Sequence, residues 1–444
     1  MKATTLGLPS RALSRSDPPL MNIPSDFRSL MLECYGGTVA DALCAALEST
    51  EPSTSVRLNV RKMRAVLGEE HVRRAVGHME STCDPVPWCP DAWYLSQRPA
   101  FTFDPLLHAG VYYVQEASSM YVADLLRRYF PPCAAGGARP VAALDLCAAP
   151  GGKSTLLCGL LPEGSVLVSN EVMPKRALVL AENMAKWTAG MPDGIYPVTS
   201  VVTQNRTSDF AAFAGQFDLL IADVPCSGEG MFRKDGQAVR DWSLDNVHFC
   251  CRRQREILDE VAHVLRPGGL LIYSTCTFNR LEDEENARYA CRLLGGEILE
   301  ERHFLPGRDR GEGFYVAAIR KPLLTAQAVS DAVPGREQDG LGRLADRVRH
   351  YLRVLYNGSL LPSDASPLPR INLSYDQALQ YLRREAVRRE APRGMVTLCY
   401  MGFPLGQGKS VGTRINNLYP PEWRIRSGYT TPYTLFPQHL FGVG

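Results

Sequence analysis

The fold is decided by the stretch Leu144-Asp145-Leu146-Cys147-Ala148-Ala149-Pro150-Gly151-Gly152-Lys153-Ser154. It leads from an apolar run, typical of a buried strand, through small residues into a helical pattern. In an open α/β sheet, the turn between a strand and the next helix is where the backbone approaches a ligand. A Walker phosphate loop is excluded because Cys147 stands where its first glycine belongs, and the Rossmann dinucleotide glycines are missing too, so the loop predicts another kind of ligand site.

The sequence on both sides of this loop repeats one theme, a short apolar run followed by a helical stretch. Such alternation predicts a parallel sheet with crossover helices, which binds its ligands at the carboxyl ends of the strands. The expected strands are 141–147, 166–170, 197–203, 217–223, 270–274 and 313–319, and the expected helices lie around 154–161, 175–187, 246–265 and 281–294.

The rest of the chain divides by composition. The N-terminal segment is polar and aperiodic, which is typical of a flexible extension, with a weak transit peptide as the alternative. A stretch rich in proline and small residues after the last expected strand predicts a linker, and 395–400 predicts a strand beyond it. The expected parts are an extension (1–20), a small α+β domain (21–104), the α/β domain (105–320), a linker (321–341) and a basic C-terminal domain (342–444).

Composition excludes several classes of protein. The 444 residues are 45% apolar and 22% charged, which is ordinary for a globular chain of two or three domains. No run approaches the roughly 18 to 20 apolar residues of a membrane span, and no secretory signal is visible, so we expect a soluble protein. The 13 cysteines are scattered without a C-x2-C pair, which argues against a disulfide scaffold and a metal site and favours the reducing cytoplasm.

Charge is unevenly distributed along the chain. Residues 341–444 carry 14 basic side chains, all arginine except Lys409, against six acidic ones, a net charge of +8, whereas the remainder carries −6. Arginine pairs bidentately with phosphate, so this region predicts an anionic polymer as partner. The alternative is a solvated helix face, to which the arginines of 383–389 could belong.

Two polar residues follow the next two expected strands. Glu171 could hydrogen-bond ribose hydroxyls, and Asn205 could meet the edge of an adenine, which together is what an adenosyl cofactor requires. The alternatives are a helix-capping acid before Lys175 and a turn residue, respectively.

Two cysteines stand directly beyond strand ends on the ligand side of the expected sheet, Cys226 three residues after Asp223 and Cys276 after Ser274. A single buried cysteine is usually inert filling, but two thiols at this edge, one near an aspartate, indicate chemistry. Carbon 5 of a pyrimidine becomes nucleophilic when a thiolate adds to carbon 6. Asp223 could stabilise this adduct at ring nitrogen 3, and the second thiol could assist release.

These motifs resemble the Sun-type (NOL/NOP/Sun) RNA cytosine-5 methyltransferases, and within them the RsmF-like bacterial enzymes of small-subunit rRNA. The C-terminal region resembles the PUA-related RNA-binding region of the RsmF type. The matching segments are 113–120, 146–153, 223–234 and 273–279 in the α/β domain, and 402–406 with 414–420 near the C-terminus.

The resemblance implies a role for each matching residue. Cys276 is expected to be the nucleophile, Cys226 to help release the product, and Asp223 to touch both cofactor and base, with Lys153 beside them. Glu171 is expected at the ribose and Asn205 at the adenine, although the family more often has aspartate there. The loop expected to hold S-adenosylmethionine is Cys147, Ala148, Ala149, Pro150, Gly151, Gly152 and Lys153.

The sequence therefore predicts an enzyme that forms 5-methylcytosine in RNA, with small-subunit rRNA as the expected substrate. The loop 228–235, with Arg233 and Lys234, is expected to face the RNA backbone, unless it is a plain exposed turn. Two alternatives remain open: the same chemistry on transfer RNA or large-subunit rRNA, and a non-catalytic RNA-binding assembly factor. We expect RNA as the partner, no membrane, no metal, and a monomer.

Overall fold

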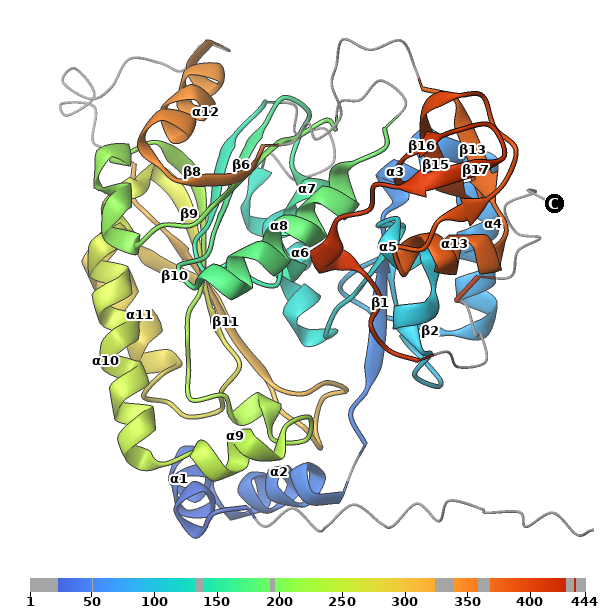
Figure 1. The fold of residues 1–444 in the computed structure, drawn as a ribbon. Helices are drawn as coiled ribbons and strands as arrows, with labels where there is room; N and C mark the ends of the chain where they lie inside the picture. The colour runs from blue at the N-terminus through green and yellow to red at the C-terminus, as the bar shows by residue number, and fades with distance from the viewer. Residues whose placement is uncertain are drawn as a thin grey trace, which may run out of the picture.

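Three β-sheets organise the computed structural model, with helices packed on and between them (Figure 1). None of its described helices is long and apolar enough to cross a membrane. The predicted extension 1–20 and most of the predicted linker lie outside the described residues. Those residues are 23–49, 51–131, 139–191, 196–323, 339–357, 368–428 and 435–436.

The central sheet has eight strands in the order β10-β11-β9-β8-β5-β6-β7-β12. Its middle is parallel, β11 runs antiparallel to β9, and β12 runs antiparallel to β7. All six predicted strands are present, which confirms the Rossmann-like α/β fold. The strands are β5 (Ala142–Asp145), β6 (Val166–Asn170), β7 (Thr199–Thr203), β8 (Phe217–Asp223), β9 (Leu265–Thr275), β10 (Glu297–Phe304), β11 (Phe314–Arg320) and β12 (Val354–Asn357).

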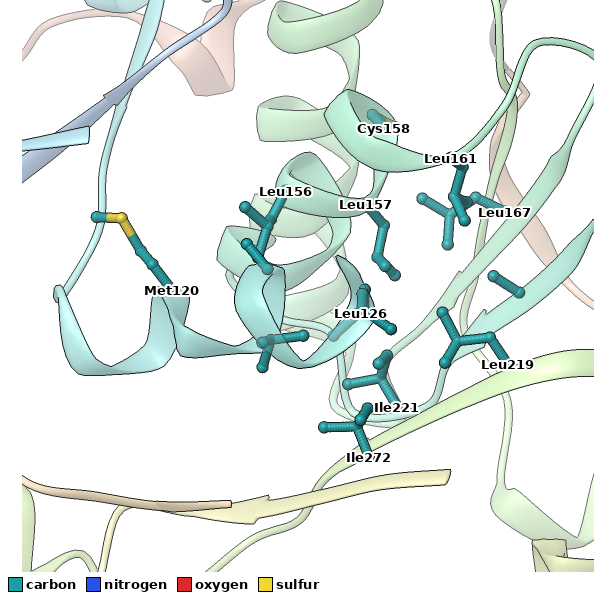
Figure 2. Packing of buried hydrophobic residues seen from close by; sticks show 14 of the residues in the cluster. Met120, Leu126, Leu156, Leu157, Cys158, Leu161, Leu167, Leu219, Ile221 and Ile272 are labelled. Carbon is teal, nitrogen blue, oxygen red and sulfur yellow. The ribbon is translucent and has the colours of Figure 1, made fainter. Parts of the chain in front are cut away.

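Apolar side chains on both faces of these strands explain why helices cover the sheet on two sides. Along β8, Leu219 and Ile221 face one core, and Leu220 faces the other, because strand side chains alternate. Figure 2 shows the first core, where Leu126, Leu156 and Leu157 meet the strands. The helices of this domain are α6 (Val122–Tyr129), α7 (Gly152–Leu160), α8 (Pro174–Thr188), α9 (Gly236–Asp241), α10 (Leu244–Val261), α11 (Glu284–Leu294) and α12 (Asp339–Tyr351).

The N-terminal segment folds as two pieces that lie apart (Figure 1). Its first two helices share a core with α9 and its neighbouring loops, through Phe27, Phe232 and Trp242. Its sheet, of order β2-β3-β1-β4, shares a different core with the C-terminal region. The elements are α1 (Ser25–Tyr35), α2 (Gly37–Ser49), β1 (Thr54–Leu58), α3 (Val60–Leu67), α4 (Glu69–Thr82), β2 (Asp84–Pro85), β3 (Ala92–Leu95) and β4 (Tyr112–Val114).

The C-terminal region forms a five-stranded sheet of order β13-β15-β16-β17-β14. Its core residues Leu398, Tyr400 and Phe403 belong to the same cluster as Val56 of β1 and Met63 of α3, so the two regions are packed together. The elements are β13 (Arg370–Leu373), α13 (Tyr375–Leu382), β14 (Val387–Arg388), β15 (Gly394–Tyr400), β16 (Phe403–Ser410) and β17 (Arg414–Asn417).

Two predicted boundaries need correction. Residues 105–114 were expected in the α/β domain, but α5 (Pro105–His108) packs through Leu106 in the core that the N-terminal and C-terminal regions share, and β4 pairs with β1. Residues 342–357 were expected in the basic C-terminal domain, but they complete the α/β domain. Leu344 and Val348 of α12 pack in the core under the central sheet, and β12 adds a strand beside β7. The apolar face of α12 is buried against this core, and β12 pairs with the edge of β7 that would otherwise be open. These two contacts explain the placement.

Candidate active site

The carboxyl ends of β5, β8 and β9 meet at one edge of the central sheet. The register places Asp145 opposite Ile221 and Asp223 opposite Ser274, so the loops that follow the three strands lie side by side. Two adjoining cavities open there, and both are lined by Glu116, Ser119, Cys147, Lys153 and Asp223.

The first cavity, of about 200 Å³, lies over the loop after β5. Gly151 has φ +115°, a left-handed conformation that favours glycine, and a Cβ at Gly152 would come within 3.4 Å of Gln115. The loop therefore keeps its backbone close to the opposite wall, which residues 113–119 provide. The lining includes six of the seven predicted loop residues, namely Cys147, Ala148, Ala149, Pro150, Gly152 and Lys153.

Asp145 adds an acidic group to this cavity. Its Oδ2 accepts a hydrogen bond from Ser154 Oγ at 2.6 Å, whereas its Oδ1 is buried without a hydrogen-bond partner among the described residues. Burial raises the pKa of Asp145 to about 7. An unpartnered buried acceptor fits a cationic donor, and S-adenosylmethionine carries such a group in its ammonium, so the residues present fit this cofactor.

The second cavity, of about 440 Å³, contains both predicted thiols. Cys226 Sγ lies 3.2 Å from Cys276 Sγ, and both residues are partly exposed. The hydrogen bond with Cys276, together with burial, raises the pKa of Cys226 well above its usual range. Cys226 therefore holds its proton while the free Cys276 thiol is beside it.

Asp223 lies between the two cavities. Its Oδ2 is 2.8 Å from Lys153 Nζ, and its Oδ1 accepts a hydrogen bond from Ser274 Oγ at 2.7 Å. Lys153 Nζ also lies 4.9 Å from the centre of the Phe314 ring. This ion pair places a carboxylate and an ammonium on the path from the first cavity to the thiols.

A buried network fixes the two thiol-bearing loops to each other, and sequence analysis missed it. Glu229 accepts hydrogen bonds from Phe278 N at 2.6 Å and Asn279 Nδ2 at 2.9 Å. Glu282 accepts one from Ser227 N at 3.0 Å and another from Asn279. Both carboxylates are fully buried, and each joins the loop after β8 to the loop after β9.

Three predicted residues are not brought to the cavities in the expected way. Neither Glu171 nor Asn205 is among the described residues that line the two cavities. Glu171 accepts a hydrogen bond from Met173 N at 2.9 Å, and its carboxylate lies 3.5 Å from Arg176 Nη1. Asn205 Oδ1 accepts from the backbone N of Arg353 at 3.1 Å. Arg233 is buried in an ion pair with Glu312 at 3.0 Å, so it does not face outward as predicted.

Residues found only in the structure had weak sequence signals. Asp145 stands within the fold-deciding stretch, and Glu116 lies within the segment 113–120, yet neither was assigned a role. Arg176, on α8, lines the thiol cavity and donates a hydrogen bond from Nη2 to Ala149 O at 2.8 Å. No local pattern marks a long side chain that reaches a site from a neighbouring helix.

Comparisons with known proteins match this architecture along the chain. The family 16S rRNA methyltransferase RsmB/F matches residues 140–320, the N-terminal domain of 16S rRNA methyltransferase RsmF matches 23–117, and the methyltransferase RsmF PUA domain matches 369–425. These three ranges follow the central sheet, the N-terminal helices and sheet, and the C-terminal sheet.

Relatives and solved structures agree with these matches. Ribosomal RNA small subunit methyltransferase F of Cronobacter sakazakii is 35% identical, covering 78% of this chain and 85% of that protein, and the one of Shewanella sp. (strain W3-18-1) is 27% identical, covering 83% and 90%. A methyltransferase homolog from Pyrococcus horikoshii has the same fold, with TM-score 0.53 and 23% identity over 66% of this chain and 93% of that one. NSun6 from Pyrococcus horikoshii, solved with SFG, has TM-score 0.53 and 17% identity over 68% and 99%. The chain belongs to the RsmF family of 16S rRNA methyltransferases.

Proposed function

We propose that this rRNA methyltransferase forms 5-methylcytosine in small-subunit rRNA through a covalent adduct with Cys276. The observation that carries the proposal is the pair of thiol sulfurs 3.2 Å apart, beside the Asp223–Lys153 ion pair and open to the first cavity. A methyltransferase that transfers a methyl group to nitrogen or oxygen does not require an active-site thiol, so two thiols at this site favour transfer to carbon.

Addition is the first step. The thiolate sulfur of Cys276 bonds to carbon 6 of the cytosine, and the double bond between carbons 5 and 6 breaks. Its electron pair makes carbon 5 nucleophilic while ring nitrogen 3 takes up the proton that the Cys276 thiol has lost. Asp223, held by Lys153 and Ser274, is placed to share that proton and so stabilise the adduct.

S-adenosylmethionine, when bound, supplies the methyl group that carbon 5 receives. The loop 147–153 and Asp145 would hold it in the first cavity, with Asp145 at its ammonium. Glu171 does not line that cavity, but its buried Oε2 accepts no hydrogen bond from the described residues, so we keep Glu171 as the expected contact of the ribose. We assign no cofactor contact to Asn205, because its amide is engaged by the backbone of Arg353.

Release requires removal of the proton on carbon 5. The freed electron pair restores the double bond between carbons 5 and 6, the bond from carbon 6 to sulfur breaks, and Cys276 leaves as a thiolate. Once Cys276 is a thioether, it no longer holds Cys226 in a thiol–thiol hydrogen bond, so the largest cause of the raised pKa of Cys226 is gone. Cys226 then gives its own proton to solvent and its thiolate takes the proton from carbon 5, while ring nitrogen 3 returns its proton through Asp223.

The substrate assignment rests on the RsmF relatives and on charge. Residues 341–444 carry a net charge of +8, and the PUA domain match lies within them. A basic surface of arginines suits the phosphates of folded RNA. We also expect the protein to act as a monomer in the cytoplasm, where small-subunit rRNA is found.

Bisulfite sequencing of total RNA, from cells with and without this gene, tests the proposal. A cytosine in small-subunit rRNA whose bisulfite protection disappears supports it. Protection lost only from transfer RNA or large-subunit rRNA would move the substrate and keep the chemistry. Unchanged protection everywhere would overturn the proposal in favour of a non-catalytic role.

A further inference from the structure

A third and larger cavity, a groove of about 1120 Å³, lies outside the site described above. One wall comes from the N-terminal region, from the connection before β1 and the residues just after β3. The other comes from catalytic loops, the one after η5 (Glu229–Met231) and the one between β10 and β11. The four contributing segments are 51–54, 95–98, 233–234 and 307–311.

The groove leads into the thiol cavity. Lys234 lines both, and Glu312, which lines the thiol cavity, ties the two walls of the groove together. Glu312 Oε1 accepts from Ser53 N at 3.0 Å, and its Oε2 pairs with Arg233 at 3.0 Å. The side chains of Arg233 and Glu312 are only 7% and 3% exposed, so the floor of the groove is held by a buried ion pair.

The groove presents positive charge. Its lining holds four cations and two carboxylates, but Arg233 is paired with Glu312 and Arg310 with Asp84, so the positive charge rests on the other two cations. Arg98 and Lys234 are exposed and make no ion pair among the described residues. Of the two lining carboxylates, Asp309 is paired with Arg308, and Glu51 makes no ion pair with a described residue.

We propose that this groove binds the single-stranded RNA that flanks the target cytidine, with phosphates at Arg98 and Lys234. The inference rests on the proposed function and extends it. A base must leave its stack to reach Cys276, so its neighbouring nucleotides have to cross the rim of the thiol cavity, where Lys234 lies. An unstacked strand with charged phosphates fits an open groove whose lining includes two cations without an ion pair among the described residues. The N-terminal domain thereby becomes part of the substrate site.

Charge removal at these two cations of the groove tests the proposal. The variants are Arg98→Ala, Lys234→Ala and their combination, with Arg98→Lys as the conservative variant. Arg252→Ala is the matched control, because Arg252 is an exposed cation on α10 without an ion pair in the described residues. The probes are a fluorescein-labelled nine-nucleotide oligocytidylate, its three-nucleotide counterpart, and in vitro transcribed 16S rRNA as methyl acceptor.

We expect the double variant to bind the nine-nucleotide strand about tenfold more weakly, with a salt dependence lowered by about 1.4 in slope, roughly 0.7 for each lost phosphate contact. The three-nucleotide strand, which is too short to fill the groove, should lose less. KM for 16S rRNA should rise more than kcat falls, Arg98→Lys should restore most of the binding, and Arg252→Ala should behave as the parent.

Two results would overturn the inference. Unchanged strand affinity and salt dependence in the double variant would mean that the flanking RNA takes another path. Loss of S-adenosylmethionine affinity in the double variant would mean that the two cations support the fold. Failure of the proposed function is distinguishable from both, because the parent protein itself would then leave 16S rRNA unmethylated.

Discussion

The two cavities of the active site are built in different ways. The cofactor cavity rests on one continuous loop, whose backbone lies close to the opposite wall because Gly151 and Gly152 have no side chains. The thiol cavity joins two loops 50 residues apart, Cys226 in one and Cys276 in the other. Buried carboxylates, Glu229 and Glu282, hold those loops in register. A site built from contiguous backbone is readable in a sequence, whereas a site held by distant side chains needs the folded structure.

The largest effects are expected from substitutions of the two cysteines in the thiol cavity, which test how that cavity differs from the cofactor cavity. Cys276→Ala should abolish product, a loss of more than about a thousandfold, because the step that activates carbon 5 disappears. Cys226→Ala should instead accumulate a protein–RNA adduct that survives denaturing electrophoresis, since addition proceeds and release does not. S-adenosylmethionine affinity, measured by calorimetry, should stay at the parent value in both. An adduct with Cys276→Ala rather than with Cys226→Ala would exchange the two roles.

A smaller effect is expected in the cofactor cavity. Asp145→Asn should weaken S-adenosylmethionine binding roughly 30- to 100-fold, because a charge-assisted hydrogen bond worth about 2 to 3 kcal/mol is lost. Since burial puts the pKa of Asp145 at about 7, its carboxylate is depleted as pH falls, and parent affinity should be about tenfold lower at pH 6 than at pH 8. Calorimetry at both pH values measures this.

The asparagine variant supplies the control for that pH dependence. Asparagine does not titrate, so its weaker affinity should be flat between pH 6 and pH 8. A pH dependence that persists in Asp145→Asn would place the titrating group elsewhere.

Glu229 tests the network that holds the thiol cavity. Glu229→Gln should lower the free energy of unfolding by about 1 to 3 kcal/mol, because the new amide group must face a donor, Phe278 N, Asn279 Nδ2 or Trp242 Nε1. It should also lower kcat, since the two thiol loops lose their register, while S-adenosylmethionine affinity stays near the parent value. Denaturant titration and single-turnover methylation measure the two effects. Unchanged kcat in a destabilised variant would confine Glu229 to a structural role.

The pH dependence of stability follows with a definite sign. Burial raises the pKa of Glu229 to about 7, above the ordinary value of 4.5 for a glutamate, so between those values the folded chain binds more protons than the unfolded one. The Glu229 contribution to stability is therefore greatest below about pH 4.5 and declines as pH rises toward 7. Glu229→Gln should flatten that part of the curve.

Asn205 is expected to show the smallest effect. Asn205→Asp should leave S-adenosylmethionine affinity within about twofold, because the side chain bonds the backbone of Arg353 rather than lining the cofactor cavity. Loss of the weak hydrogen bond from Nδ2 should cost stability about 0.5 to 1.5 kcal/mol. A change of more than tenfold in S-adenosylmethionine affinity would support the predicted contact between Asn205 and the adenine.

The sequence predicted more of the fold than of the side-chain arrangement. The six strands were predictable because strands covered on both faces are continuous apolar runs, although the last of them, β11, runs antiparallel to β9 and not parallel as expected. β10 was missed because its sequence is rich in charged residues, as suits a strand at the edge of the sheet. β12 was missed because four residues carry little pattern, and its partner β7 lies about 150 residues earlier.

The candidate site divides in the same way. Lys153, Asp223, Cys226 and Cys276 lie together as predicted, although their catalytic roles remain predictions. Arg233 was expected on the surface and is buried instead, since its partner Glu312 comes from a loop 79 residues later. The spacing of residues along the sequence does not reveal an ion-pair partner in so distant a loop.

By itself, the sequence determined which loops meet, because the carboxyl ends of neighbouring parallel strands share one edge of a sheet. Only the tertiary structure decided which side chains enter the cavities, how close the two sulfurs lie, and that the N-terminal region forms one wall of the basic groove. The physical reason is that local patterns fix backbone direction and burial. The partner of a buried charge is fixed by packing between segments far apart in the chain.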